Sequence, residues 1–276
     1  SLGGQGVGVR CTLDRPPLLP QPLPRVPATP HLRERLPVMA LGAGVVAISF
    51  AAIFFRKAAP AHPLVAAGGR LALAALVLAP WVWRRWSSLS PRVRRAALGG
   101  GVFYALHFGT WVWSLSLTSV AAAVTLVTAT PLLLAVVASL RGRDQPTRTQ
   151  WAAIAVGVIG VLIIAHDAPG GGALLGDLLA FLGALAMVGY LLLVRDLGPV
   201  DPFAFTGIAC AIGGLLLLGT AVVLGVPLEV PTVESGGFIV LSALVPQLIG
   251  HSSITFALRS LTPTTIGLAT VCEPVG

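Results

Sequence analysis

The chain has 276 residues, of which 55% are hydrophobic and only 10% are charged, and its mean hydropathy is +0.89. A soluble domain carries about 25% charged residues, so the composition excludes a water-soluble globule and indicates an integral membrane protein. The formal charge of +8 does not indicate nucleic-acid binding, because the arginines flank apolar runs and form no basic stripe interleaved with aromatic residues.

The first 36 residues differ from the rest of the chain. They are rich in proline and arginine, with seven prolines between Pro16 and Pro30. They contain no apolar run of the kind found in a signal peptide. We therefore predict that residues 1–36 form a disordered segment.

Nine apolar runs follow this segment. A helix needs about 20 apolar residues to cross a bilayer, and helices satisfy their own backbone groups in lipid. The runs lie at about 37–55, 63–83, 96–117, 119–140, 151–166, 173–194, 202–224, 235–258 and 262–276. We predict an all-α integral membrane protein in which Pro131 and Pro246 distort the helices that contain them.

The distribution of charge orients these helices. Most of the 18 basic residues lie on the same side of the predicted bundle as the N-terminus. The opposite side has Arg56 and Lys57, and its segment 225–235 carries acidic residues without a basic one. The positive-inside rule therefore predicts a cytoplasmic N-terminus in the cell membrane. The strong preference for arginine over lysine favours a GC-rich, bacterial source.

The chain also repeats itself. Three pairs of segments align in the same order, with offsets of 139, 144 and 143 residues: 62–78 with 201–217, 107–119 with 251–263, and 129–131 with 272–274. A repeat of five helices has an odd count, so its second copy crosses the membrane in the opposite sense, as in many secondary transporters. We predict two inverted five-helix repeats, at 37–168 and 173–276, with ten helices expected, nine present and the last truncated.

Several of these segments resemble the EamA family of the drug/metabolite transporter superfamily. They are GGRLALAALVL (68–78), LTSVAAAVTLVTATPLLLAVVASL (117–140) and LTPTTIGLATVCEPV (261–275). The resemblance implies ten helices, two inverted repeats and transport of small metabolites, often outward. Two features depart from the family pattern: Thr130 stands where the second repeat has Glu273, and the tenth helix is absent.

Polar residues inside a membrane are costly and are by default functional. Tyr104, His107 and Trp111 follow helical spacing and share one face of the third helix. Gln247 and His251 do the same in the eighth helix, and the two histidines occupy equivalent repeat positions. We predict that these faces meet and line a substrate cavity. The alternative is that each histidine only satisfies a neighbouring backbone or hydroxyl group.

Three further polar residues are candidates for the same site. Thr125 lies in the fourth helix, which we expect to line the cavity. Arg70 either extends to the outer headgroups or has a gating or substrate-binding role. Glu273 would lie inside the ninth helix, where an unpaired carboxylate is costly. It is a proton carrier, a counter-ion for an amine, or a structural cap of a broken helix.

These features predict a secondary transporter that exports a small metabolite or amino acid by alternating access. The chain has no GxxxxGK[ST], GxSxG or HExxH motif, and its three cysteines are widely spaced. We therefore do not expect the protein to be an enzyme or to bind a cofactor or a metal ion. The expected partners are a small-molecule substrate and the lipid bilayer, and nucleic acid is not expected. The sequence does not decide whether transport is coupled to protons or whether the protein forms a homodimer. The alternative function is a non-transporting truncated remnant or structural membrane protein.

Overall fold

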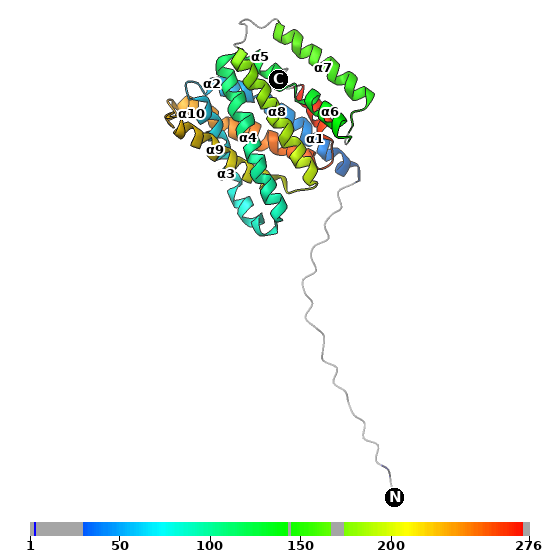
Figure 1. Cartoon of the computed structure of the whole chain (residues 1–276). Helices are drawn as coiled ribbons and strands as arrows, with labels where there is room; N and C mark the ends of the chain where they lie inside the picture. Colours follow the sequence, from blue (N-terminus) through cyan, green and yellow to red (C-terminus); the bar gives the residue numbers. More distant parts are fainter. Residues whose placement is uncertain (1–2, 4–29, 143–144, 167–173, 273–276) are drawn as a thin grey trace.

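A computed structural model describes residue 3 and residues 30–142, 145–166 and 174–272, and every regular element in these ranges is a helix. The helices form one bundle in which the N-terminal helix and the last helices lie close together (Figure 1). The predicted all-α fold is confirmed.

The helices fall on the nine apolar runs, three of which contain a break, but the first helix begins at Pro30, so residues 30–36 are helical and the expectation of disorder was wrong for them. In chain order they are α1 (Pro30–Ser49), α2 (Ala51–Lys57), α3 (Pro63–Arg85), the 3-10 turn η1 (Trp86–Ser88), α4 (Pro91–Leu117), α5 (Val120–Val127), α6 (Thr130–Arg141), α7 (Arg148–His166), α8 (Leu174–Leu197), α9 (Pro202–Val223), α10 (Val233–Ser242), the π-helix η2 (Ala243–His251), α11 (Ser252–Ala257) and α12 (Pro263–Thr270).

Local sequence explains where many of these helices begin. Four helices, α3, α4, α9 and α12, combine a side-chain cap with a proline in the first turn, where no helical N–H partner is needed. In each case the preceding side chain accepts a hydrogen bond from a free N–H of the first turn. These capping residues are His62, Ser90, Asp201 and Thr262.

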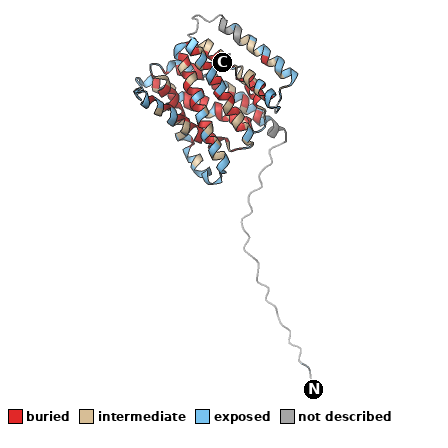
Figure 2. Cartoon of the chain, in the orientation of Figure 1, coloured by how far each residue is buried: buried red, intermediate tan, exposed pale blue. Residues whose placement is uncertain are grey.

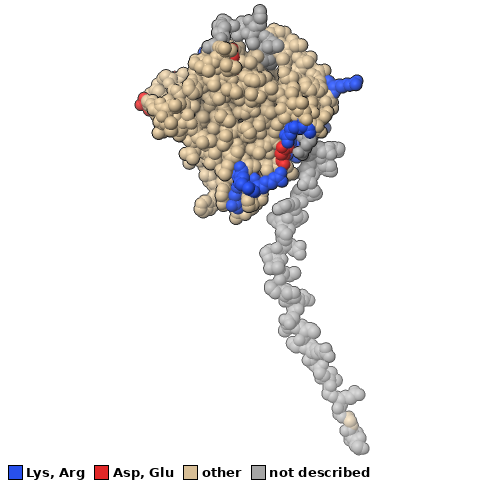
Figure 3. Space-filling view, in the orientation of Figure 1, with Lys and Arg blue, Asp and Glu red and all other residues tan. Residues whose placement is uncertain are grey.

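Six segments of the described chain are long and apolar enough to cross a membrane. They are Arg35–Lys57, Pro63–Ser88, Val120–Arg141, Leu174–Leu197, Pro202–Val223 and Val233–Ala257. Only 39% to 50% of each span is buried within the protein, so buried residues lie inside the bundle and apolar side chains cover much of its outside (Figure 2). Most of the face in Figure 3 has no charged side chain, as a surface in contact with lipid requires.

Polar contacts bring together the loops at one end of the bundle. Arg85, at the end of α3, pairs with Asp201, which precedes α9, at 3.5 Å. Arg141, at the end of α6, pairs with Asp196 near the end of α8 at 2.5 Å. The C-terminal ends of α3, α6 and α8 therefore lie at the same end of the molecule.

A second set of contacts marks the opposite end. Arg56 of α2 donates to the carbonyl of Leu115 near the end of α4. The hydroxyl of Thr118, which follows α4, donates to Asp177 in the first turn of α8 at 2.9 Å. The span formed by α1 and α2 thus ends where α8 begins. The two halves of the chain enter the bundle from opposite ends, as the inverted-repeat prediction requires.

Two glycines allow α9 to approach its neighbours closely. A Cβ atom on Gly101 of α4 would lie 2.5 Å from the Cβ of Ile212, and one on Gly214 of α9 would lie 3.0 Å from the main-chain nitrogen of Ala72 in α3. No side chain fits at either position without displacing a helix. Small residues of this kind allow close helix packing in membranes.

Both prolines within the apolar runs coincide with helix distortions, as predicted. Pro131 follows the break between α5 and α6 and cannot bond to the carbonyl of Val127. The hydroxyl of Thr130 donates to that carbonyl instead, at 2.7 Å. Pro246 lies within the π-helix η2. Both distorted regions lie beside the internal cavity described below.

Candidate functional site

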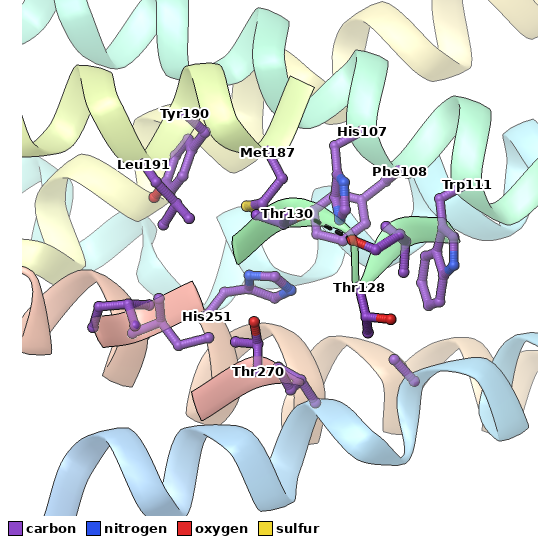
Figure 4. A pocket seen from close by; sticks show the side chains of 15 residues that line it. His107, Phe108, Trp111, Thr128, Thr130, Met187, Tyr190, Leu191, His251 and Thr270 are labelled. Carbon is purple, nitrogen blue, oxygen red and sulfur yellow. Dashed lines mark hydrogen bonds between the residues drawn. The ribbon is translucent and has the colours of Figure 1, made fainter. Parts of the chain in front are cut away.

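A cavity lies inside the bundle between helices from both halves of the chain. Side chains from α4 and α8 reach it from one side, opposite those of His251 and Thr270 (Figure 4). The described lining residues are Ile48, Ala51, His107, Phe108, Trp111, Val127, Thr128, Thr130, Met187, Tyr190, Leu191, His251, Ile254, Ile266 and Thr270. This set is mainly apolar and aromatic, with two imidazoles, three threonine hydroxyls and the phenol of Tyr190.

The cavity is small in this conformation. About 630 Å³ of empty space lies among its lining atoms, but the centres of water molecules can occupy only about 50 Å³. One water needs about 10–15 Å³ on this measure, so the cavity has room for only a few waters. A metabolite can enter only if the surrounding helices move apart.

The two predicted histidines face each other across this cavity. The ring centroids of His107 and His251 are 6.3 Å apart, and both side chains are buried. The structure therefore brings these two predicted residues together.

The two rings are held differently. His107 Nδ1 lies 2.8 Å from the carbonyl oxygen of Gly183 in α8. A carbonyl only accepts, so Nδ1 carries the hydrogen, and the neutral ring keeps Nε2 as an acceptor. His251 has no hydrogen bond to its ring within the described part of the chain. It packs edge-on against Phe108 at 5.1 Å and against Tyr104 at 5.9 Å.

The three lining threonines use their hydroxyl hydrogens on main-chain carbonyls of their own segment. Thr128 donates to Val124 at 2.9 Å and to Thr125 at 2.8 Å, Thr130 to Val127 at 2.7 Å, and Thr270 to Gly267 at 2.7 Å. These bonds satisfy carbonyls at the break between α5 and α6 and near the end of α12. They also fix which side of each hydroxyl is left for a ligand.

Arg70 and Gln247 form a buried polar group beside the cavity. Arg70 Nε donates to Gln247 Oε1 at 3.1 Å, and Gln247 Nε2 donates to the sulfur of Cys210 at 3.3 Å. The guanidinium lies 4.2 Å from the centroid of the Phe108 ring. Arg70 is fully buried, so the alternative in which its side chain extends to the headgroups is wrong.

Several predicted site residues do not line the cavity. Tyr104 lies behind it, stacked on Tyr190 with ring centroids 4.3 Å apart. Gln247 and Thr125 are also absent from its described lining, although Thr125 is a close sequence neighbour of Thr128. Glu273 lies outside the described residues. Of the predicted residues, His107, Trp111 and His251 are the ones that the structure places at the cavity.

The contribution of the first and sixth helices was missed. Ile48 and Ala51 line the cavity from the first span, and Met187 and Tyr190 line it from α8. The offset of 139 residues relates Ile48 to Met187 and Ala51 to Tyr190. The repeat thus brings equivalent positions of the two halves to the cavity, which helical spacing of polar residues does not reveal.

In the described ranges, no group of three or more His, Cys, Asp or Glu side chains is placed to bind a metal ion. The described lining has no Asp, Glu, Lys or Arg. Ligand-binding cavities in proteins are likewise lined mainly by apolar and aromatic side chains with a few hydrogen-bonding groups.

Comparison with known proteins supports this description. A solved crystal structure has the same fold with a TM-score of 0.72, at 17% sequence identity, covering 87% of this chain and 86% of its own. The curated proteins compared give no match. The model of the EamA-like transporter family matches residues 36–166 and 174–276. The chain therefore belongs to the EamA-like transporter family, a family of multi-pass membrane proteins.

Proposed function

We propose that this protein is a secondary transporter that exports a small metabolite or amino acid across the cytoplasmic membrane by alternating access. The observation that carries this proposal is the central cavity, lined by both halves of the chain, with His107 and His251 6.3 Å apart. Membership of a transporter family supports it. The sequence has no ATP-binding motif, so an ion or substrate gradient would supply the energy.

The size of the cavity supports a mechanism in which its helices move. The space described has room for only a few waters, so substrate entry requires an open state that faces one side of the membrane. The break between α5 and α6 and the π-helix η2 both contribute lining residues. Backbone in these regions has already lost regular helical bonds, so bending there sacrifices fewer of them than bending a regular helix.

Proton coupling is a further part of the proposal. Glu273 follows the lining residue Thr270 by three positions, and its carboxylate would carry a proton or act as the counter-ion of a substrate amine. Replacing it by glutamine is expected to abolish the dependence of transport on a pH gradient while the protein still inserts. An unchanged response to the gradient in Glu273→Gln would assign a structural role to this residue.

The proposed orientation places the N-terminus in the cytoplasm. Cysteines introduced at Ser87 and Thr147 are then shielded from a membrane-impermeant thiol reagent in intact cells, whereas one at Thr232 reacts. Reaction at the first two positions and protection of the third would reverse the orientation.

The transport proposal is tested with purified protein in proteoliposomes. We expect accumulation of at least one member of a panel of radiolabelled amino acids and small metabolites when a gradient is imposed. His107→Ala and His251→Ala should each reduce the rate, whereas Thr220→Val, which alters an exposed hydroxyl of α9, should not. A wild-type protein that moves no compound under any gradient would favour the non-transporting alternative.

A further inference from the structure

A groove lies on the outside of the bundle, where α3, α4 and α9 meet. The centres of water-sized molecules have about 610 Å³ available in it, compared with about 50 Å³ in the internal cavity. Small residues on two helices account for its depth: Ala75 and Ala79 on α3, and Gly207 and Ala211 on α9. Ala79 and Ala211 are exposed, so the groove opens toward the surroundings of the protein. We call it the outer groove.

The outer groove is about as long as one leaflet of a membrane. Along α3 and the η1 turn its lining runs from Ala75 to Trp86, a length of about 16 Å at the helical rise of 1.5 Å per residue. One leaflet takes half of a hydrocarbon core of about 30 Å. Trp83 and Trp86 line one end and are 86% and 47% exposed. Because tryptophan prefers the level of the lipid headgroups, the groove extends from that level toward the midplane, as an acyl chain does.

Arginines surround the headgroup end of the outer groove. The segment 80–98, in which α3 turns into α4, contains five arginines and no Asp or Glu. The guanidinium of Arg94 lies 4.8 Å from the ring centroid of the lining residue Trp86, and Arg84 directly follows Trp83 in the sequence. Figure 3 shows basic side chains gathered near the end of the bundle that this turn forms.

Two described carboxylates lie close to this turn, and each already has an arginine partner. Asp201 pairs with Arg85, and Asp196 pairs with Arg141. The arginines of the segment 80–98 therefore outnumber the carboxylates near them. This excess of positive charge favours a negative group at the headgroup end of the outer groove.

We propose that the outer groove binds an anionic phospholipid. One acyl chain lies along Ala79 and Ala211, and the phosphate lies beside Arg84 and Arg94, whose guanidinium groups suit it geometrically. The apolar groove by itself selects no lipid over another, because the tails of the bilayer are equally apolar. The preference therefore comes from the charge of the headgroup. In the orientation proposed above, the site belongs to the cytoplasmic leaflet.

A second copy of the chain suits this face less well. In a two-fold dimer whose axis follows the membrane normal, the same surface patch of both copies meets at the same depth. Such a contact at the outer groove would bring together two segments 80–98 with five arginines each. Their mutual repulsion opposes this contact, whereas a phosphate neutralises the charge.

Native mass spectrometry of the purified full chain in detergent micelles tests the preference for charge. The protein is titrated with phosphatidylglycerol, which is anionic, or with phosphatidylcholine that has the same acyl chains and no net charge. We expect phosphatidylglycerol to bind at least about 10-fold more tightly, since each arginine near an anionic headgroup contributes about fivefold. Soluble glycerophosphate, which lacks acyl chains, should not displace it. Equal affinity for the two lipids, or displacement by glycerophosphate, would overturn the proposal.

A pair of double variants locates the headgroup. Arg84→Gln combined with Arg94→Gln removes two charges beside the outer groove and should weaken phosphatidylglycerol binding about 25-fold. Arg148→Gln combined with Arg259→Gln is the matched control, because these exposed arginines lie on segments that do not contribute to the described lining of the groove. The control should bind as the wild type does. An equal loss in both double variants would show that the charge of this whole end, and not the groove, attracts the lipid.

Filling the outer groove tests the position of the acyl chain. Ala79→Phe places a ring in the groove, so phosphatidylglycerol should bind at least about 10-fold less tightly. Ala155→Phe changes an exposed alanine of α7 in the same way and should leave binding unchanged. Unchanged binding in Ala79→Phe would overturn the proposal, as would a wild-type dimer that this variant dissociates. The arginine variants decide the question independently if Ala79→Phe fails to fold.

Discussion

The third and eighth helices occupy equivalent positions in the two repeats, yet they are built differently. α4 is an uninterrupted α-helix of 27 residues. Its counterpart consists of α10, the nine-residue π-helix η2 and α11. Both present a histidine to the cavity, but among the described residues only His107 has a ring hydrogen bond to a neighbouring helix. The two equivalent positions thus share a histidine side chain, but the helices around them have different backbone structures.

This difference assigns different tasks to the two helices. α4 is regular, packs closely on α8 and α9, and presents His107 in one orientation. The eighth helix contains Pro246 and a π-helix that ends at His251. π-helical turns occur mostly as local bulges and frequently mark functional sites. During the proposed transport cycle, we expect the eighth helix to move His251 while α4 keeps His107 in place.

The largest expected effect comes from placing a proline in α4, which tests whether this helix must stay regular. The offset of 144 residues relates Pro246 to Val102, an exposed residue near the middle of α4. Val102→Pro removes a helical hydrogen bond and clashes with the preceding turn, so we expect a loss of about 3 kcal/mol or more in stability. Val102→Ala is the matched control and should remain close to wild type. Denaturation in micelles followed by circular dichroism measures both, and a loss of under about 1 kcal/mol would show that α4 tolerates the same bend.

Gln247 tests the polar link between η2 and α3. Gln247→Leu leaves the buried Nε of Arg70 without its acceptor, and we expect destabilisation by about 2 kcal/mol. Gln247→Glu keeps an oxygen beside Arg70 and should be less destabilising than the leucine variant. Thermal unfolding of the three proteins checks this order. Equal stability of wild type and Gln247→Leu would mean that the link does not hold η2 in place.

The two histidines should differ in their contribution to stability. His107→Leu loses the bond to Gly183 and is expected to cost about 1 kcal/mol. His107→Asn can place an N–H near the position of Nδ1 and should recover part of that loss. His251→Leu breaks no described hydrogen bond, so its cost should be smaller than that of His107→Leu. Thermal unfolding measures both losses of stability. Equal losses for His107→Leu and His251→Leu would show that the two histidines do not differ in this respect.

The smallest expected effect on stability is that of Pro246→Ala. The π-helix already accommodates the missing N–H, so replacing the proline should change stability by less than about 1 kcal/mol. If η2 moves His251, the variant should instead slow transport in proteoliposomes. An unchanged transport rate would indicate that the proline serves packing.

The sequence predicted much of this architecture because the bilayer imposes simple constraints. Runs of apolar residues must be helices in lipid, and the helical spacing around His107 correctly predicted a buried polar face on α4. The burial of Arg70 was not predictable, because the sequence does not show that α3 and η2 bring Gln247 beside it. Spacing arguments assume 3.6 residues per turn, so they could not reveal a π-helix at Ala243–His251.

The lining of the cavity was harder to predict than its polar centre. Ile48 and Leu191 line it with apolar side chains, and apolar residues look alike in a membrane helix whether they face lipid or a cavity. Tyr104 and Gln247 were placed on the correct faces of their helices, but they lie one layer behind the cavity. That distinction depends on how far each helix stands from the centre, which periodicity does not encode.

The close approach at Gly101 and Gly214 has a consequence for the unit that moves. α9 belongs to the second half of the chain, yet it touches α3 and α4 of the first half at distances that leave no room for a side chain. Helices in such contact translate together, since sliding would drive Ile212 and Ala72 into the opposing backbone. Under the proposed alternating-access mechanism, the units that move relative to each other would therefore each contain helices from both halves of the chain, and they would not coincide with the two sequence repeats.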